Sequence, residues 1–446
     1  MLSRIKKRLT VVALGAWVGA VGGPVHAAGF QIQEQSVSGL GNAFAGGAAS
    51  AEDASTVFYN PAGLARLQRQ VDVGVHVIFP SSEFHDENST NAIGGRATGK
   101  EDDGGKTALA PNLYYAQPLG ERFSIGLGIN APYGLVTEYD KNWIGRYHAV
   151  KSDLRTININ PAAAFKISDQ FALGFGLSAQ YADAELSNAI DFGALGFLAG
   201  APVQPSTPAF DGFTKLTGDD WGFGFNLGVL FQPQPSTRIG LAYRSKIDHT
   251  ISGDNSLTIP AFATALAGPS RTRAATADLT TPATLSLSGY HDINAQWAVM
   301  ADITWTDWSA FDELRIKFKD GSADSVQPEN WEDTFRYSIG VNFKPAQAWT
   351  LRAGLAYDET PVPNARLRTP RIPDNSRTWL ALGATYRIAD SFSFDFGYVH
   401  VFLNDTSIRN TEVTTGNLAG VPVGSTLDGS FDSSVDILSA QVQWQF

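Results

Sequence analysis

The sequence contains no cysteine and only two methionines among its 446 residues. Without cysteine the chain has no disulfide framework, no thiolate nucleophile and no sulfur ligand for a metal ion. Basic residues are also scarce, because 33 Lys and Arg stand against 44 Asp and Glu and give a formal charge of −11. Since nucleic-acid binding needs clustered positive charge, we expect no nucleic-acid partner.

Long hydrophobic runs are missing beyond the start of the chain. Basic residues between Arg4 and Arg8, an apolar run over residues 9–21 and a small-residue end at Ala27 form the pattern of a secretory signal peptide. We expect residues 1–27 to be removed; the alternative is an uncleaved anchor. No later apolar run reaches the about 20 residues of a membrane-spanning helix. With 44 glycines and 11% aromatic residues, an exported chain of this kind is either a secreted β protein or an outer-membrane barrel.

Residues 28–69 are rich in Gly, Ala and Ser and follow neither a helical nor a strand period for long. The segment is too apolar for a plain linker and too irregular for a wall element. We therefore predict that it is an N-terminal hatch, which plugs a barrel formed by residues 70–446.

Alternation dominates the rest of the chain. Apolar residues occupy every second position in runs such as 71–79, 123–130, 171–181, 221–229, 349–357 and 392–398. Successive side chains of a strand point to opposite faces, so each run has one apolar face and one polar or small face. A soluble β-sandwich has the same period. Aromatic residues near the run ends, and Gly rather than dense charge on the second face, favour a membrane barrel.

The connections between these runs alternate in length. Short turns separate some runs, and seven long connections separate the others: 81–107, 133–152, 185–218, 253–276, 319–329, 359–376 and 404–431. Outer-membrane barrels have an even number of strands, short periplasmic turns and long external loops. The sequence therefore predicts an all-β fold, a 14-stranded antiparallel transmembrane β-barrel with both ends on the periplasmic side.

The last strand alternates up to the final residue, Phe446. A terminal Phe on such a strand resembles the C-terminal signal of bacterial outer-membrane proteins, which the insertion machinery reads. The other interpretation is a strand that ends in Phe without this role.

Two of the external loops, 185–218 and 253–276, are unexpectedly apolar and have roughly helical spacing. One interpretation is that short helices pack on each other and close the barrel mouth. The other is that they form an apolar groove for a hydrophobic ligand, since exposed apolar patches usually mark binding sites. The candidate ligand contacts in these loops are Phe192, Leu195, Phe197, Leu198, Ile259 and Phe262.

The segment AGFQIQEQSVSGLGNAFAGGAA, the following AEDASTVFYNPAGLARL and the later motifs APYGL, WGFG, LAYRS, SGY, WTDWS and DETPVP resemble the FadL family of outer-membrane transporters. This family carries long-chain fatty acids and other hydrophobic compounds, and includes relatives that carry toluene. The resemblance covers essentially the whole chain after residue 27. It implies capture by the two apolar loops, transfer to an inner apolar site near the N-terminus and exit through a lateral opening at a kink in the third strand.

The resemblance also implies roles for single residues. Phe30 is expected to contact the ligand, and Asn60, Pro61 and Ala62 to belong to the hatch. The strand kink is expected at Ala131, Pro132, Tyr133 and Gly134. Pro cannot donate to a strand ladder, which supports a break there, although these residues could equally end the strand at its external loop.

One departure concerns the charge of the ligand. Fatty-acid carriers of the family place basic side chains at two positions that align here with Asn188 and Glu332. Either another basic residue, with Arg336, Arg352 and Arg377 as candidates, meets the carboxylate, or the ligand is an uncharged aromatic hydrocarbon.

Other functions find little support. No two histidines have a metal-ligand spacing, and no nucleophile elbow or phosphate loop occurs, so we expect no metal, no cofactor and no enzyme activity. An outer-membrane hydrolase whose residues come from separate strands, a structural barrel and an open porin are the alternatives. The expected partners are a hydrophobic small-molecule substrate and outer-membrane lipid.

Overall fold

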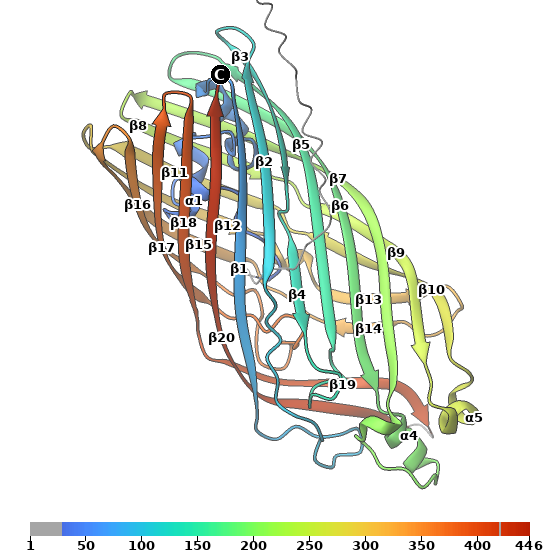
Figure 1. The fold of residues 1–446 in the computed structure, drawn as a ribbon. Helices are drawn as coiled ribbons and strands as arrows, with labels where there is room; N and C mark the ends of the chain where they lie inside the picture. The colour runs from blue at the N-terminus through green and yellow to red at the C-terminus, as the bar shows by residue number, and fades with distance from the viewer. Residues whose placement is uncertain (1–28, 419–420) are drawn as a thin grey trace, which may run out of the picture.

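The computed structural model describes residues 29–418 and 421–446 (Figure 1), so the predicted signal peptide lies outside the described residues. Its strands are β1 (Gln70–Asp86), β2 (Ala108–Pro118), β3 (Phe123–Asn130), β4 (Gly134–Glu138), β5 (Lys151–Lys166), β6 (Phe171–Ile190), β7 (Gly212–Gln234), β8 (Thr237–Arg244), β9 (Ile247–Thr258), β10 (Arg271–Thr281), β11 (Thr284–Asp292), β12 (Trp297–Thr306), β13 (Glu313–Phe318), β14 (Ser325–Pro328), β15 (Thr334–Ala346), β16 (Trp349–Asp358), β17 (Arg377–Ala389), β18 (Phe392–Leu403), β19 (Thr406–Leu418) and β20 (Val421–Gln445). The helical elements are α1 (Val37–Leu40), α2 (Gly47–Ser50), α3 (Thr56–Tyr59), η1 (Pro61–Arg66), α4 (Phe192–Leu198), η2 (Pro208–Phe210), η3 (Ala261–Ala263), α5 (Thr264–Ala267) and η4 (Trp308–Ala310). Within the described ranges, no helix is long and apolar enough to cross a membrane.

The strands form one antiparallel sheet that closes on itself where β1 pairs with β20, in the register Val75 opposite Ala440. Six wall strands consist of two segments each: β3 with β4, β8 with β9, β10 with β11, β12 with β13, β14 with β15 and β18 with β19. Counted this way the wall has 14 strands, which confirms the predicted barrel. Closure leaves no sheet edge, as a membrane interior requires.

The outer surface of the wall is apolar. In β6, Leu173, Phe175 and Leu177 are exposed, whereas the alternate Ala172, Ser178 and Gln180 are buried toward the lumen. Aromatic pairs ring the wall near the short turns, for example Phe123 with Phe165, Trp297 with Phe343, Trp349 with Tyr386 and Trp444 with Phe446. An apolar band flanked by aromatic residues is the pattern of a transmembrane barrel.

The predicted short turns are confirmed, whereas several long connections differ from the prediction. β6 runs to Ile190 and β9 to Thr258, so the two apolar loops are shorter than 185–218 and 253–276. The predicted connection 404–431 is mostly the hairpin of β19 and β20. These strand ends lie beyond the apolar band, where both faces can be polar. Apolar alternation therefore fades although Thr, Val and Ile still favour strand.

Residues 29–69, called the N-terminal segment below, lie inside the ring of strands (Figure 1, blue). Helix α1 contacts β17, β18 and β20, α2 contacts β8 and β11, and η1 contacts β5, β6 and β7. Glycines of the wall permit this approach: a Cβ on Gly174, Gly240 or Gly354 would overlap backbone atoms of the segment. β1 begins at Gln70, directly after the segment that the sequence sets apart.

Buried arginines of the wall fasten the N-terminal segment. Arg352 forms a 3.0 Å ion pair with Glu52, and Asn342 donates a 2.9 Å hydrogen bond to the same carboxylate. Arg336 donates to the carbonyl of Ala43 at 2.9 Å. The segment is therefore held by charge as well as by packing.

Candidate functional site

Phe30 lies in an aromatic cluster that consists of Phe30, Tyr133, Trp308, Phe311 and Trp331. Its ring centroid is 4.8 Å from that of Trp308, 5.4 Å from that of Phe311 and 5.7 Å from that of Trp331. Only 1% of Phe30 is exposed. The pairs with Trp308 and Phe311 are edge-to-face, and such packing adds about 0.5–1.5 kcal/mol per pair beyond burial. The start of the described chain therefore fills an apolar site near the middle of the barrel.

The third wall strand is interrupted at Ala131–Tyr133, between β3 and β4, and Gly134 is the first residue of β4. At the break the backbone pairs with the N-terminal segment. Ile32 N donates to Pro132 O and Gly134 N donates to Phe30 O, both at 2.9 Å. The break is thus a turn into the lumen rather than the start of an external loop.

Strand β2 is paired on one side only over residues 108–112. These residues pair with β1, whereas its pairing with β3 begins at Leu113 and no pairing with β4 is present in the described chain. Pro111 lies in this one-sided stretch, where a residue without a backbone N–H is tolerated best. The wall is therefore locally open between β2 and β4, beside the aromatic cluster.

Asn60, Pro61 and Ala62 form the start of η1. The Asn60 side chain accepts a hydrogen bond from Ala62 N at 3.1 Å and donates to Ala48 O and Val229 O at 2.6 and 3.0 Å. Asn is a favoured helix cap and Pro a favoured first residue, so the local sequence dictates this turn. Asn60 thereby joins two parts of the N-terminal segment to β7.

Two short helices occupy the apolar loops at the end of the barrel opposite the C-terminus (Figure 1). Phe192, Leu195, Ile259 and Ala263 form a buried core between α4 and η3. Phe197, Leu198 and Phe262 are exposed by 50%, 49% and 37%. The predicted contact residues therefore divide into a core that packs the helices together and an exposed apolar surface beside it.

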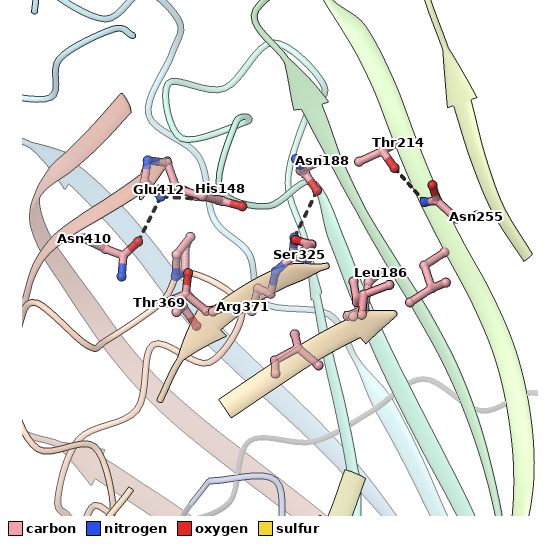
Figure 2. A pocket seen from close by; sticks show the side chains of 15 residues that line it. His148, Leu186, Asn188, Thr214, Asn255, Ser325, Thr369, Arg371, Asn410 and Glu412 are labelled. Atoms are coloured by element: carbon pink, nitrogen blue, oxygen red, sulfur yellow. Dashed lines mark hydrogen bonds and ion pairs between the residues drawn. The ribbon is translucent and has the colours of Figure 1, made fainter. Parts of the chain in front are cut away.

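A polar chamber lies between these loops and the aromatic cluster: along β9, Leu257 packs against the loop core, Asn255 lines the chamber and Ile251 packs in the cluster that contains Phe30. Figure 2 shows the side chains that line the chamber. It has a volume of about 50 Å³. Arg371, which Figure 2 shows pointing toward Asn188, donates to the Asn188 side chain at 3.2 Å. His148 accepts or donates at 3.2 Å with Asn410 and lies 3.8 Å from Glu412. The other lining residues are Leu186, Thr214, Leu216, Asn255, Leu314, Ile316, Ser325, Gln327, Thr369 and Pro370.

Burial perturbs the titratable groups in and near this chamber. It raises the pKa of Glu412 to about 7 and the pKa of Glu329 to about 8, and Arg371 opposes both shifts. Burial lowers the pKa of His148 to about 4. Near neutral pH the His148 ring is therefore uncharged, and both carboxyl groups hold much of their proton.

The basic residues that the sequence offered for a ligand carboxylate are engaged elsewhere. Arg352 pairs with Glu52, Arg377 pairs with Asp374, and Arg336 lies over the rings of Phe44 and Trp379. Glu332, aligned with a basic position of fatty-acid carriers, is exposed and does not line the chamber. Asn188 does line it.

Sequence reasoning missed Trp308, Phe311, Trp331 and Arg371. A signal for the first two was present, because the run WTDWSAFD is rich in aromatic residues and interrupts the alternation. The structure breaks the ninth wall strand there, at η4. Another break lies at Pro282, between β10 and β11. The Pro282 carbonyl accepts a 2.9 Å hydrogen bond from the Tyr133 hydroxyl. Arg371 lies in a connection without periodicity, so no pattern singled it out.

Residues 18–446 match the family described as outer membrane protein transport protein (OMPP1/FadL/TodX). The chain is 33% identical to the long-chain fatty acid transport protein of Escherichia coli O6:H1 over 89% of its length and 92% of that protein. Its fold is similar to that of a Pseudomonas aeruginosa FadL homologue, with a TM-score of 0.85, 28% identity and coverage of 94% and 100%. The Ralstonia pickettii toluene transporter TbuX shares the fold, with a TM-score of 0.63, 23% identity and coverage of 90% and 96%. The chain therefore belongs to the OMPP1/FadL/TodX family of transport proteins of the outer membrane.

Proposed function

We propose that this protein carries long-chain fatty acids passively across the outer membrane. Its family transports hydrophobic compounds across that membrane. Full-length similarity to a long-chain fatty acid transport protein supports the fatty-acid class, whereas the toluene transporter shares only the fold. The observation that carries the proposal is the order of three features along the barrel: an exposed apolar surface, a polar chamber and a closed aromatic cluster beside an unpaired stretch of wall.

Capture begins at the outer loops. Phe197, Leu198 and Phe262 offer exposed apolar area, and Phe192, Leu195 and Ile259 hold the helices that carry them. Apolar burial stabilises a bound chain by about 0.8 kcal/mol per CH₂ group. Because this groove is open to water, it exchanges ligand readily and serves as the first station.

Release requires movement of the N-terminal segment, which we propose acts as the hatch. The ligand then takes the place of Phe30 in the aromatic cluster. Leaving this site separates Phe30 and Ile32 from the strand break at Pro132 and Gly134. The segment around Asn60, Pro61 and Ala62 stays fixed to β7 as the base of the hatch.

The exit is lateral, between β2 and β4. The one-sided pairing of residues 108–112 and the inward turn at Ala131–Gly134 support this route. An apolar ligand that leaves here enters lipid directly, and so avoids exposure of its chain to water. The chain itself supplies no energy source, and the ligand moves down its gradient.

A disulfide between the hatch and the strand break tests this route. Gln31 and Tyr133 face each other as bridge partners, and the chain has no cysteine of its own. Cross-strand partners lie about 4.5–5.5 Å apart, which suits a disulfide. We expect the oxidised Q31C/Y133C variant to stop oleate uptake by cells and the reduced form to restore it. Equal uptake in both forms would show that the hatch does not have to leave the break.

Two further proposals complete the function. The insertion machinery recognises the terminal strand through Phe446, whose ring packs with Trp444 at 4.5 Å and under Arg69 at 4.3 Å. The protein is not an enzyme: the serine–histidine contacts of the described residues, Ser439 to His76 at 2.7 Å and Ser425 to His148 at 3.3 Å, join buried side chains. Hydrolysis of a long-chain ester by the refolded protein, lost in Ser439→Ala or in Ser425→Ala, would overturn the second proposal.

A further inference from the structure

We propose that Arg371 binds the ionised carboxylate of the substrate in the polar chamber, so that the protein selects anionic amphiphiles over uncharged hydrophobic molecules. This inference rests on the proposed transport of fatty acids. It places the carboxylate headgroup of the ligand at Arg371, and it implies that the ligand is negatively charged.

The contacts of Arg371 are all with neutral groups. Its guanidinium donates to Ser152 Oγ at 3.1 Å, to Asn188 Oδ1 at 3.2 Å and to Lys151 O at 3.4 Å. Among the described residues no carboxylate oxygen lies within 4.0 Å of an Arg371 side-chain nitrogen, which is the distance limit for an ion pair. By contrast, the buried Arg146, Arg352 and Arg377 each pair with a carboxylate. Arg371 therefore brings an uncompensated positive charge to the chamber.

The nearby acidic groups do not cancel this charge near neutral pH. Glu412 and Glu329 are the carboxyl groups whose charges Arg371 influences, and burial keeps both substantially protonated there. His148 is neutral under the same conditions. A guanidinium stays protonated even when it is buried, and it matches a carboxylate with two parallel hydrogen bonds.

The chamber has the size of a headgroup and not of a whole lipid. Its volume is about 50 Å³, and a single water needs roughly 10–15 Å³ on this measure. A carboxylate fits with little room for a hydrocarbon chain. Leu186, Leu216 and Leu314 line one side of the chamber, and Leu314 also packs against the cluster that contains Phe30. This arrangement places the headgroup at Arg371 and the chain toward the aromatic cluster.

Asn188 connects this geometry with the sequence. It occupies a position where the sequence comparison expected a basic residue, and its side-chain oxygen instead orients Arg371. The positive charge that Asn188 of β6 lacks therefore comes from Arg371, in the connection between β16 and β17. The wall arginines are engaged elsewhere: Arg336 and Arg352 hold the N-terminal segment, and Arg377 pairs with Asp374.

The test compares binding of oleate and of oleyl alcohol to the full-length refolded protein at pH 6.5, with Arg371→Gln against the unsubstituted chain. We expect the substitution to weaken oleate binding roughly 10-fold to 100-fold, the range for loss of a hydrogen bond to a charged group, and to leave oleyl alcohol binding unchanged. Arg366→Gln is the matched control, since Arg366 is an exposed residue of the same loop. Its affinity for both ligands should equal that of the unsubstituted protein.

Equal weakening of both ligands by Arg371→Gln would overturn the inference, and so would no change in either. If the variant does not fold, the unsubstituted protein decides alone: oleate must bind more tightly than oleyl alcohol. Equal affinities would remove the headgroup site while the proposed transport stands. Binding of neither ligand would instead remove the proposed function.

Discussion

The apolar surface of the outer loops and the aromatic cluster are both rich in phenylalanine, yet the first is exposed and the second is buried. Phe197 in the outer loop is 50% exposed, whereas Phe30 in the cluster is 1% exposed. Short helices on the outer loops present side chains to water. In the cluster, three breaks in the wall bring Tyr133, Trp308 and Trp331 around Phe30.

This difference in exposure implies a different energetic cost of ligand binding at the two places. In the proposed pathway, a ligand enters the outer loop surface without displacing protein, so its affinity there would reflect apolar burial alone. It would enter the aromatic cluster only if Phe30 leaves, so part of the burial energy would offset the loss of aromatic packing. The proposed two-site arrangement would give easy capture and controlled release.

The first prediction applies one substitution to both sites. Phe30→Ala removes a buried ring, and such changes cost about 3–5 kcal/mol. We expect the N-terminal segment to open more often, because its first residues lose their main contact. Hydrogen exchange of the backbone amides of residues 31–45 should become faster by orders of magnitude. Phe197→Ala is the matched control and should leave exchange of this segment unchanged.

Slow exchange in Phe30→Ala would contradict the comparison, since it would mean that the cluster does not hold the segment. A change in tryptophan emission provides a second measurement. Trp308 and Trp331 lie within 5.7 Å of the Phe30 ring centroid, so only the Phe30 variant should shift it.

A second prediction concerns the base of the segment. Gly174→Val places a side chain against the backbone of Ala62, and overpacking of this kind costs about 1–3 kcal/mol. We expect the displaced segment to leave an open path, which single-channel recording in planar bilayers should detect as increased ion conductance.

Gly289→Val is the control for this measurement. Gly289 is also a wall glycine, but a Cβ there meets nothing within 4 Å. Its conductance should match that of the unsubstituted protein. Equal conductance of the two variants would show that the absence of a side chain at Gly174 is not required for the N-terminal segment to pack against the wall.

The third prediction separates the two kinds of phenylalanine in the outer loops. Phe197→Ser together with Phe262→Ser removes exposed apolar area, so uptake at low oleate concentration should fall severalfold, for a loss of about 1 kcal/mol. The fold should be unaffected, because both residues are surface residues. Phe192→Ser acts differently: it places a hydroxyl in the core between α4 and η3, and we expect local protease sensitivity of residues 191–211. Unchanged uptake in the double variant would remove the groove from the pathway.

The sequence predicted much of this architecture because its signals are periodic. Alternation at positions such as Leu173, Phe175 and Leu177 marked the wall, and the short turns were confirmed. The outer hairpin of β19 and β20 was not predicted, because a strand outside the membrane needs no apolar face. The aromatic cluster and the chamber were not predicted for another reason. Arg371 and Trp331 lie in irregular connections, and only the closed barrel brings them to Asn188 and Phe30.

The smallest predicted effect is a pH dependence that belongs to the chamber and not to the aromatic cluster. The pKa of Glu412 is raised to about 7, so this group loses its proton as the pH rises from 6 to 8. Its carboxylate then attracts Arg371 and competes with the ligand. Glu329 adds to the effect nearer pH 8, and His148 stays neutral throughout. Oleate affinity should therefore fall roughly twofold to threefold over this range, as for a partly screened charge pair of about 0.5 kcal/mol.

Two controls separate this effect from a change of the whole protein. Glu412→Gln cannot ionise, so its oleate affinity should keep only the weaker dependence from Glu329. Oleyl alcohol should bind equally at pH 6 and pH 8, because it carries no charge to compete for. Isothermal titration at pH 6 and at pH 8 measures the affinity of each of these protein–ligand pairs. An equal fall in the affinities for oleyl alcohol and oleate would place the titrating group in the apolar pathway. It would contradict the prediction that the pH dependence belongs to the chamber and not to the aromatic cluster.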